Sequence, residues 1–322
     1  MLENVRSAAN KFFSEFYESK YVFEIIPIKG YLTTNVYKID VQVNGSKMSF
    51  FVKESSDLNN DKFNGFIKNE YLNTKHVSDE FVINEELKTV IPIKYYDDHN
   101  LFFMNAIKGQ RLDVVMKNLV YFKKNKKFIH VINLCRQWLF KFHAIDSIDN
   151  YEAKTFKKSE INKLEFIKNR SLKNIEKENY AELLLMYEKA SDLLESLEVS
   201  VCDFSYKHND YAPWNIMFDG EKITVYDFAD IKIDYKYYDL MYFIHSIEKL
   251  FRYYPFKNSV ISTVKSEMTK GLDIKEDVLK YYSMYFYLQD IELYLRKMKV
   301  NGIKKYAFRL LYKLIILKLK KL

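Results

Sequence analysis

The chain has 322 residues, of which 48% are apolar, and it carries a formal net charge of +8. This length favours two lobes over one small domain. There is no run of about 18 apolar residues to predict a membrane-spanning helix, and the N-terminus lacks the apolar stretch of a secretory signal. The two cysteines lie far apart and form neither a metal cluster nor a disulfide framework. We therefore expect a cytoplasmic protein.

The positive charge is concentrated at the C-terminus. Residues 296–322 hold ten basic and no acidic side chains, which leaves a net charge of −2 for the rest of the chain. Because no basic stripe recurs elsewhere, the sequence does not predict a nucleic-acid-binding protein.

The first part of the chain has the pattern of a small sheet. After an N-terminal helix, Asn44-Gly45 separates two strand-like runs, which is the signature of a tight hairpin. We predict strands within residues 22–53, a helix over 61–77, and further strands over 89–95 and 101–107. These elements predict an N-terminal nucleotide-binding lobe, residues 1–105, that holds an antiparallel sheet and one main helix.

Beyond residue 105 the pattern is mainly helical. Apolar residues recur at helical spacing over residues 127–145, and further helices are predicted over 159–177, 180–197 and from 237 onward. A mixed section at 202–230 lies between them. We predict an α+β fold in which residues 106–322 form a larger, mostly helical catalytic and substrate lobe.

The mixed section carries the residues with the clearest chemistry. Asp210 and Asn215 lie five residues apart, and Asp227 follows a predicted hairpin at residues 216–226. Transfer of a phosphoryl group requires a carboxylate to orient and deprotonate the attacking hydroxyl, and oxygen ligands for magnesium. The sequence therefore predicts Asp210 as the catalytic residue, and Asn215 and Asp227 as metal ligands.

The run from His208 to Asn215, with Asp227-Phe228-Ala229 after it, resembles the catalytic segment of the aminoglycoside phosphotransferase and choline kinase superfamily. Trp214 stands where many members of that superfamily have glycine. The resemblance implies a protein-kinase-like fold of two lobes, an ATP-dependent O-phosphotransferase activity and a requirement for Mg²⁺. It also implies that His208 is a structural residue, since the proton transfer is assigned to Asp210.

Upstream residues fit the nucleotide site that this resemblance implies. Lys53 ends a predicted strand, as does the lysine that contacts the α- and β-phosphates, and Glu70 lies on the next helix, where it is placed to pair with Lys53. Glu80, Glu85 and Glu86 are alternatives to Glu70. The other predicted nucleotide-binding residues are Thr33, Thr34 and Asn35 in the loop that covers the phosphates, and Met104 and Ala106 in the hinge beside adenine.

The acceptor is less constrained than the chemistry. We expect a hydroxyl of a small molecule, with a sugar or glycan alcohol, including a lipid-linked one, as the first hypothesis. A choline-like amine alcohol or an antibiotic is the alternative, and Trp214, Tyr235, Tyr237 and Tyr238 are candidates for cation–π contacts with a quaternary amine. An alternative from another class is an inactive kinase-like module that binds nucleotide and regulates a partner.

The last segment, residues 303–322, has the composition of an amphipathic helix. Leu310, Leu311 and Leu314 share one side, while Arg309 and Lys313 lie on the other. One hypothesis is a terminal helix that packs on the second lobe. The other is peripheral contact with an anionic membrane, because basic residues near such a surface are attracted to it.

Overall fold

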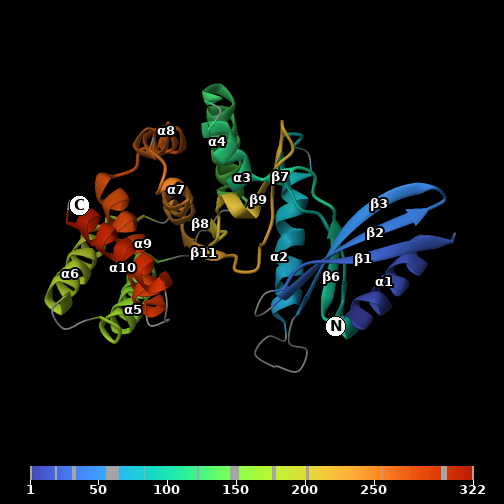
Figure 1. The fold of residues 1–322 in the computed structure, drawn as a ribbon, viewed down its shortest axis with the longest axis horizontal. Helices are drawn as coiled ribbons and strands as arrows, with labels where there is room; N and C mark the ends of the chain where they lie inside the picture. Colours follow the sequence, from blue (N-terminus) through green and yellow to red (C-terminus); the bar gives the residue numbers. More distant parts are fainter. Residues whose placement is uncertain are drawn as a thin grey trace. The chain divides into compact units, whose positions relative to one another are not determined.

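A computed structural model describes most of the chain. The described residues are 2–18, 20–30, 34–55, 65–82, 84–121, 123–145, 152–175, 179–200, 203–255, 257–298 and 303–320. They form two compact units, each made of two chain segments (Figure 1). The first unit is Met1–Ile145 with His208–Ile231, and the second is Asp146–Lys207 with Lys232–Leu322.

The first unit contains a five-stranded antiparallel sheet with the strand order β1-β2-β3-β6-β5. Its strands are β1 (Tyr21–Gly30), β2 (Thr34–Val43), β3 (Ser46–Ser55), β5 (Pro92–Tyr96) and β6 (Leu101–Asn105). The predicted hairpin is confirmed: Asn44 and Gly45 join β2 to β3 with φ angles of 50° and 82°. Both angles lie in the left-handed region that a tight hairpin turn requires.

The two faces of β3 have different partners because side chains alternate along a strand. Phe50 and Val52 are buried in a core that the helix α1 (Leu2–Phe16) completes, and Phe12 of that helix stacks on Phe103 with ring centroids 4.2 Å apart. Lys53 points to the opposite face, where α2 (Phe66–Phe81) lies. The alternation therefore carries Lys53 away from the apolar core and toward the helix that bears Glu70.

A second sheet joins the two segments of the first unit. It has the order β4-β10-β9-β7, with β4 (Leu87–Thr89) parallel to β10 (Ile223–Val225), and with β9 (Ile216–Phe218) and β7 (Gln110–Arg111) antiparallel beyond it. The prediction of one strand over residues 89–95 is wrong. Val90 and Ile91 separate β4 from β5, which belong to different sheets, since Val90 donates its backbone N–H to Val225 rather than to the first sheet.

Helices complete the first unit. The predicted helix over residues 127–145 is α4 (Asn125–His143), and it buries Trp138, Leu139 and Phe142. A helix that the sequence analysis did not anticipate, α3 (Leu112–Tyr121), precedes it. The short η2 (Asp97–His99) and η5 (Pro213–Asn215) connect strands.

The second unit is mostly helical. Its helices are α5 (Ala153–Leu172), α6 (Tyr180–Ser196), α7 (Tyr237–Phe251), α8 (Lys257–Thr269), α9 (Glu276–Lys297) and α10 (Ile303–Leu319), and its strands β8 (Phe204–Lys207) and β11 (Lys232–Tyr235) pair antiparallel. Helix α9 is buried on most of its circumference, which explains why its sequence is rich in tyrosine and phenylalanine. Within the described residues, no helix has both the length and the apolar character needed to cross a membrane.

Helix α10 packs on α9, and only part of its predicted apolar side is buried. Leu311 is buried together with Ile315 and Leu319, whereas Leu310 and Leu314, predicted on the same side as Leu311, are 57% and 39% exposed. Ile315 and Leu319 extend the apolar row that begins at Leu311, and that longer row, rather than the one through Leu310 and Leu314, meets the rest of the unit.

The α+β architecture, with its N-terminal antiparallel sheet and larger helical part, is confirmed. The predicted lobes, residues 1–105 and 106–322, stay a prediction. The first compact unit also includes residues 106–145 and 208–231, because β4 pairs with β10, α4 packs on those two strands and α3 packs on β7 and β9.

Candidate active site

Three of the predicted residues meet in the first unit as one ionic cluster. The Lys53 ammonium lies 2.7 Å from Glu70 Oε1 and 2.7 Å from Asp227 Oδ1. Lys53 comes from β3, Glu70 from α2, and Asp227 from the segment after β10. Lys53 therefore pairs with Glu70, as predicted. The alternative partners Glu80, Glu85 and Glu86 are all exposed.

Burial and charge act in opposite directions in this cluster. Burial disfavours the charged form of Lys53, but the carboxylates of Glu70 and Asp227 outweigh it and raise the pKa of the ammonium. Burial alone would raise the pKa of Asp227, yet Lys53 holds it below its usual range. Glu70 is almost fully enclosed and shares the Lys53 ammonium with Asp227, so burial raises the pKa of Glu70 to about 7. Asp227 is thus the more acidic of the two carboxyl groups in the cluster.

A second group of polar side chains lies in the loop of residues 208–215, which follows β8. Asn215 donates its side-chain N–H groups to the backbone carbonyl of Asp210 at 2.9 Å and to Asp210 Oδ2 at 2.8 Å. Trp214 Nε1 lies 3.4 Å from the same carboxylate oxygen. The spacing of five residues is therefore realised as a closed loop in which Asn215 fixes the orientation of the Asp210 carboxylate.

Backbone hydrogen bonds tie this loop to the segment that bears Asp227. The Tyr226 N–H donates to the carbonyl of Asn215 at 3.1 Å, and the Tyr226 hydroxyl donates to the carbonyl of Trp214 at 2.5 Å. Asp227 follows directly with a φ angle of 74°, in a region that residues other than glycine rarely adopt. The β9–β10 hairpin thus returns the chain from Asn215 to Asp227, as the sequence predicted.

Buried aromatic rings pack together beside these two groups of polar residues. Trp138 of α4 stacks on Tyr211 with ring centroids 5.3 Å apart and on Phe142 at 5.2 Å. His208 and Phe228 contact the same group of rings, and His208 Nε2 lies 3.2 Å from the carbonyl oxygen of Tyr226. His208 is therefore enclosed among rings, in agreement with a structural role. The sequence analysis gave Trp138 no such role, although its helical spacing placed it on a core face.

The donor atoms of Asn215 and Asp227 fit a magnesium ion. Asn215 uses its amide nitrogen on Asp210, which leaves its Oδ1 as the available ligand atom. The Asp227 side chain is 36% exposed. The described residues contain no group of three or more His, Cys, Asp or Glu suited to a metal. A two-ligand site is nevertheless sufficient, because Mg²⁺ bound with a nucleotide takes one or two carboxylates and completes its shell with phosphates and water.

The remaining predicted nucleotide-binding residues lie around the first sheet. Thr33 is outside the described residues. Thr34 and Asn35 form the start of β2, with Asn35 paired to Gly30 across the hairpin, and the Thr34 side chain is buried. Met104 is buried in β6, between β3 and β5, and Ala106 follows the end of that strand. Their roles toward a nucleotide stay predictions.

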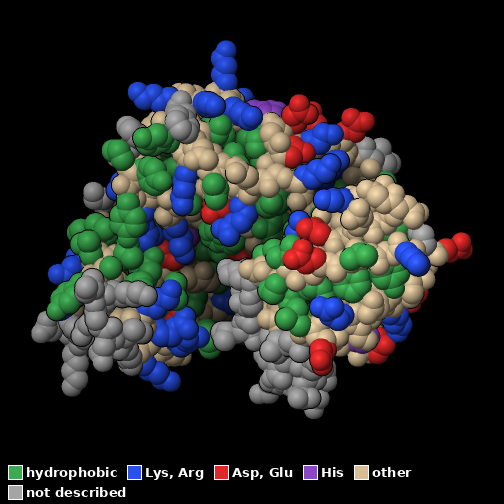
Figure 2. All heavy atoms as spheres, turned by 45° about the vertical axis from the view of Figure 1, so that its right-hand side comes forward, with side chains coloured by type: hydrophobic (Ala, Val, Ile, Leu, Met, Phe, Trp, Pro, Cys, Tyr) green, Lys and Arg blue, Asp and Glu red, His purple; other side chains and the backbone are tan. Residues whose placement is uncertain are grey.

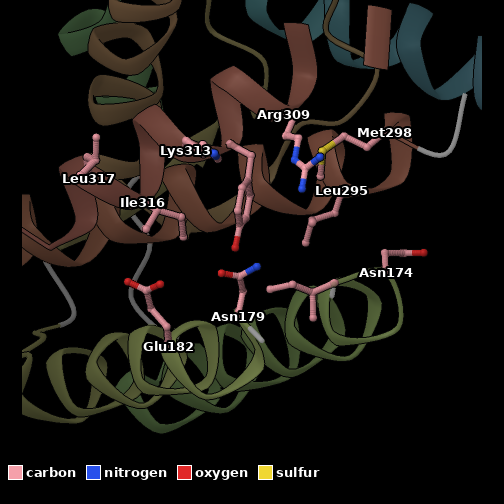
Figure 3. A pocket seen from close by; sticks show the side chains of 11 residues that line it. Asn174, Asn179, Glu182, Leu295, Met298, Arg309, Lys313, Ile316 and Leu317 are labelled. Atoms are coloured by element: carbon pink, nitrogen blue, oxygen red, sulfur yellow. The ribbon is translucent and has the colours of Figure 1, made fainter. Parts of the chain in front are cut away.

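The second unit has a separate cavity of about 470 Å³ that contains none of the predicted site residues. Leu295 and Ile316 form part of its apolar wall (Figure 3). Arg309 of α10 borders the cavity on one side, while Glu182 and Asn179 point from α6 toward that helix. The sequence analysis gave no signal for this cavity, because it depends on how α6, α9 and α10 pack.

Comparisons with known proteins relate part of the sequence to a family of phosphotransferases, and the fold to solved kinase structures. Residues 134–254 match the sequence profile of the phosphotransferase enzyme family. No curated protein sequence matches the chain. The match over residues 134–254 confirms the predicted resemblance to phosphotransferases.

Solved structures share the fold over nearly the whole chain. One is a spectinomycin phosphotransferase in complex with ADP and spectinomycin, at 15% identity and a TM-score of 0.57, with 98% of each chain covered. Another is a choline/ethanolamine kinase family protein from Mesorhizobium loti, at 13% identity and a TM-score of 0.57, with 99% of this chain and 94% of that one covered. A choline kinase from Cryptosporidium parvum has 13% identity and a TM-score of 0.59, with 100% and 96% covered. These likenesses confirm the kinase-like fold.

Proposed function

We propose, from the premise that residues 134–254 match the phosphotransferase enzyme family, that the protein transfers the terminal phosphoryl group of ATP to a hydroxyl of a small molecule. One observation carries the proposal. A single compact unit contains both the Lys53–Glu70–Asp227 cluster and the Asp210–Asn215 pair, which are the polar groups that direct phosphoryl transfer needs.

Each residue has a role that follows from its surroundings. Lys53 uses two of its three N–H donors on Glu70 and Asp227 in the described contacts, and the third is directed to a phosphate oxygen. Asp210, held by Asn215, accepts the proton of the attacking hydroxyl on a carboxylate oxygen. Asn215 Oδ1 and the Asp227 carboxylate hold Mg²⁺, which shields phosphate charge when it is bound.

For the acceptor we propose a neutral, hydroxyl-rich molecule, with a sugar or glycan alcohol, including a lipid-linked one, as the leading class. Trp214 is half-buried, and its indole Nε1 lies 3.4 Å from Asp210 Oδ2, so the ring is close to the proposed position of the reacting hydroxyl. The choline-like alternative has less support. Tyr235 and Tyr238 are buried, and the Lys207 ammonium already lies 3.8 Å from the centroid of the Tyr238 ring.

The test is a screen of metabolite and glycan pools for an ATP-dependent mass increase of one phosphate. Asp210→Asn should retain ATP binding and lose transfer by roughly 10²–10⁴-fold, the usual contribution of a general base. Asp79→Asn, the same substitution at an exposed position of α2, is the matched control and should leave transfer unchanged. Phosphoryl transfer by Asp210→Asn at the wild-type rate would show that Asp210 is not the catalytic base. ATP binding by the wild type with transfer to no pool would favour the inactive regulatory module.

Peripheral contact with an anionic membrane through residues 303–322 is a second part of the proposal. Tyr306, Leu310 and Leu317 of α10 are exposed and follow one another at helical spacing. Arg309 and Lys313, both exposed, lie along one side of this row. Exposed apolar and basic side chains on one helix are the arrangement of an interfacial helix. On the face shown in Figure 2, Lys and Arg side chains are scattered and do not form a single basic stripe.

Sedimentation with vesicles of neutral and anionic lipid tests this contact. The double variant Leu310→Ser with Leu317→Ser should lose binding to anionic vesicles at low salt and keep ATP binding. Leu72→Ser, at an exposed leucine of α2, is the matched control. Because the electrostatic part is screened, wild-type binding should fall as salt rises. Equal sedimentation of the wild type with neutral and anionic vesicles would contradict the proposal.

A further inference from the structure

Helix α2 makes a contact beyond the ion pair of Glu70. One turn further along, Asn73 donates its side-chain Nδ2–H to the backbone carbonyl of Phe228 at 3.1 Å. Residues three apart on a helix lie on the same face, so Glu70 and Asn73 both point toward the segment that contains Asp227. Asn73 is only partly buried, so its presence is not explained by core packing.

The segment that Asn73 contacts has an unusual backbone. Asp227 has a φ angle of 74°, and a residue other than glycine keeps that strained conformation only when its surroundings hold it there. Three of the described contacts are made by Asp227 and Phe228 themselves. Lys53 binds the Asp227 carboxylate, the Phe228 ring is buried against His208, and Asn73 binds the Phe228 carbonyl.

The contact of Asn73 is the one of these three that acts on the main chain. A carboxylate can rotate about its own side-chain bonds while it stays bonded to Lys53, and a buried ring fixes its own position rather than the adjacent peptide plane. A hydrogen bond to the Phe228 carbonyl fixes the peptide between Phe228 and Ala229, one residue beyond Asp227. It therefore restrains the backbone next to the residue that bears the metal-binding carboxylate.

We propose that Asn73 is a positioning residue that couples helix α2 to the metal-binding segment. Through Glu70 the helix sets the position of Lys53, and through Asn73 it fixes the backbone at Phe228, directly after Asp227. Helix α2 thereby fixes the Lys53 ammonium and the segment that bears the Asp227 carboxylate relative to each other. The inference rests on the proposed function, because it assigns Asn73 to the same nucleotide and magnesium site.

The test is calorimetric titration of the full-length protein with ATP at increasing Mg²⁺ concentration, which requires no knowledge of the acceptor. Asn73→Leu and Asn73→Asp both remove the amide donor. The leucine variant adds no charge, and the aspartate variant preserves the shape of the side chain. We expect each to raise the Mg²⁺ concentration at which ATP affinity is half-maximally enhanced by roughly 10-fold or more, the usual effect of losing a group that orients a metal ligand. ATP binding without Mg²⁺ should stay within about twofold of the wild type, since neither variant changes the Lys53 ammonium.

The matched controls are Asn69→Leu and Asn69→Asp, the same substitutions one turn earlier on α2, where Asn69 is exposed. Both should titrate like the wild type. A purely structural role of Asn73 would weaken ATP binding equally with and without Mg²⁺, and that result would overturn the inference while leaving the proposed function intact. If wild-type ATP binding itself were independent of Mg²⁺, the proposed function would fail first, and the inference with it.

Discussion

Two ionic clusters, one in each compact unit, show how similar residues serve different purposes. In the first unit, one lysine, Lys53, faces two carboxylates, and the side chain of one of these, Asp227, is 36% exposed. In the second unit, Lys207 and Lys163 bind Asp234, Lys163 also binds Glu160, and Tyr281 donates its hydroxyl to Glu160. The first, open cluster has one lysine for two carboxylates, and one of these carboxylates is partly exposed, whereas the second, closed cluster has two lysines for two carboxylates, and both of its carboxylates are buried.

This difference indicates that the first cluster is suited to bind a cation and that the second stabilises the fold. An unbalanced, partly exposed set of carboxylates attracts a cation from solution. A buried set whose charges cancel has no such capacity, and its members stabilise the fold only together. The second cluster also encloses Lys207 completely: its ammonium is 1% exposed and lies over the Tyr238 ring, and burial lowers the pKa of this lysine although Asp234 favours its charged form.

The largest expected effect concerns the closed cluster. Lys207→Met leaves Asp234 buried with Lys163 as its remaining cation, and breaking a buried pair in this way costs about 3–5 kcal/mol. We expect a loss of that size in the free energy of unfolding, measured by urea denaturation. Lys232→Met is the matched control, since Lys232 is exposed and lies opposite Lys207 in the β8–β11 pair. Equal losses in the two variants would show that the closed cluster has no special stabilising role.

A smaller effect on stability, but a specific one on binding, is expected in the open cluster. Asp227→Ala leaves a balanced Lys53–Glu70 pair, so the fold should tolerate it. The magnesium-dependent part of ATP binding should fall by roughly 10–100-fold because the metal loses its anionic protein ligand. Calorimetry with and without Mg²⁺ measures this, and Asp230→Ala, at an exposed position nearby, is the control. Unchanged magnesium dependence would remove Asp227 from the site.

A third expected effect is a pH dependence of the free energy of unfolding. Burial raises the pKa of Glu70 from its ordinary 4.5 to about 7, so the folded state retains a proton that the unfolded state releases. This contribution to stability is complete below pH 4.5 and is lost as the pH rises through 7. Between pH 5 and pH 7 the wild type should lose up to about 1.4 kcal/mol per pH unit relative to Glu70→Gln.

Urea denaturation at several pH values measures this difference, and Glu80→Gln, on the exposed side of the same helix, should show none. A wild type that gained stability over Glu70→Gln across this range would contradict the predicted direction. It would mean that Lys53 outweighs burial at Glu70, as it does at Asp227.

The sequence was most informative where function depends on spacing along a short segment. Asp210 and Asn215 meet because five residues form one closed loop, and Asp227 returns to that loop because a tight hairpin precedes it. Such local geometry follows from turn chemistry, which a sequence displays directly. The pairing of Lys53 with Glu70 was also predicted, although there the sequence left Glu80, Glu85 and Glu86 open.

The sequence was least informative where packing chooses between similar alternatives. Residues 87–96 divide between two sheets because Val90 bonds to Val225, a partner 135 positions away. The buried face of α10 is the one through Leu311, Ile315 and Leu319, although Leu310 and Leu314 are equally apolar. Asn73 carried no signal, because an asparagine on a helix has a defined partner only when another segment is placed against it.

The sequence by itself therefore predicted the residues of the site as residue types at fixed spacings: a catalytic aspartate, two metal ligands and a lysine–glutamate pair. Of these, the Lys53–Glu70 pair is seen directly as a contact, and the catalytic and metal-binding roles stay predictions. Tertiary structure alone decided which charges lie together and whether they lie open or closed. It set Lys53 between two carboxylates and enclosed Lys207 beside Asp234. The physical reason is that the charge balance and exposure of a cluster depend on segments far apart in the chain, whose contacts are set by burial of apolar surface rather than by local pattern.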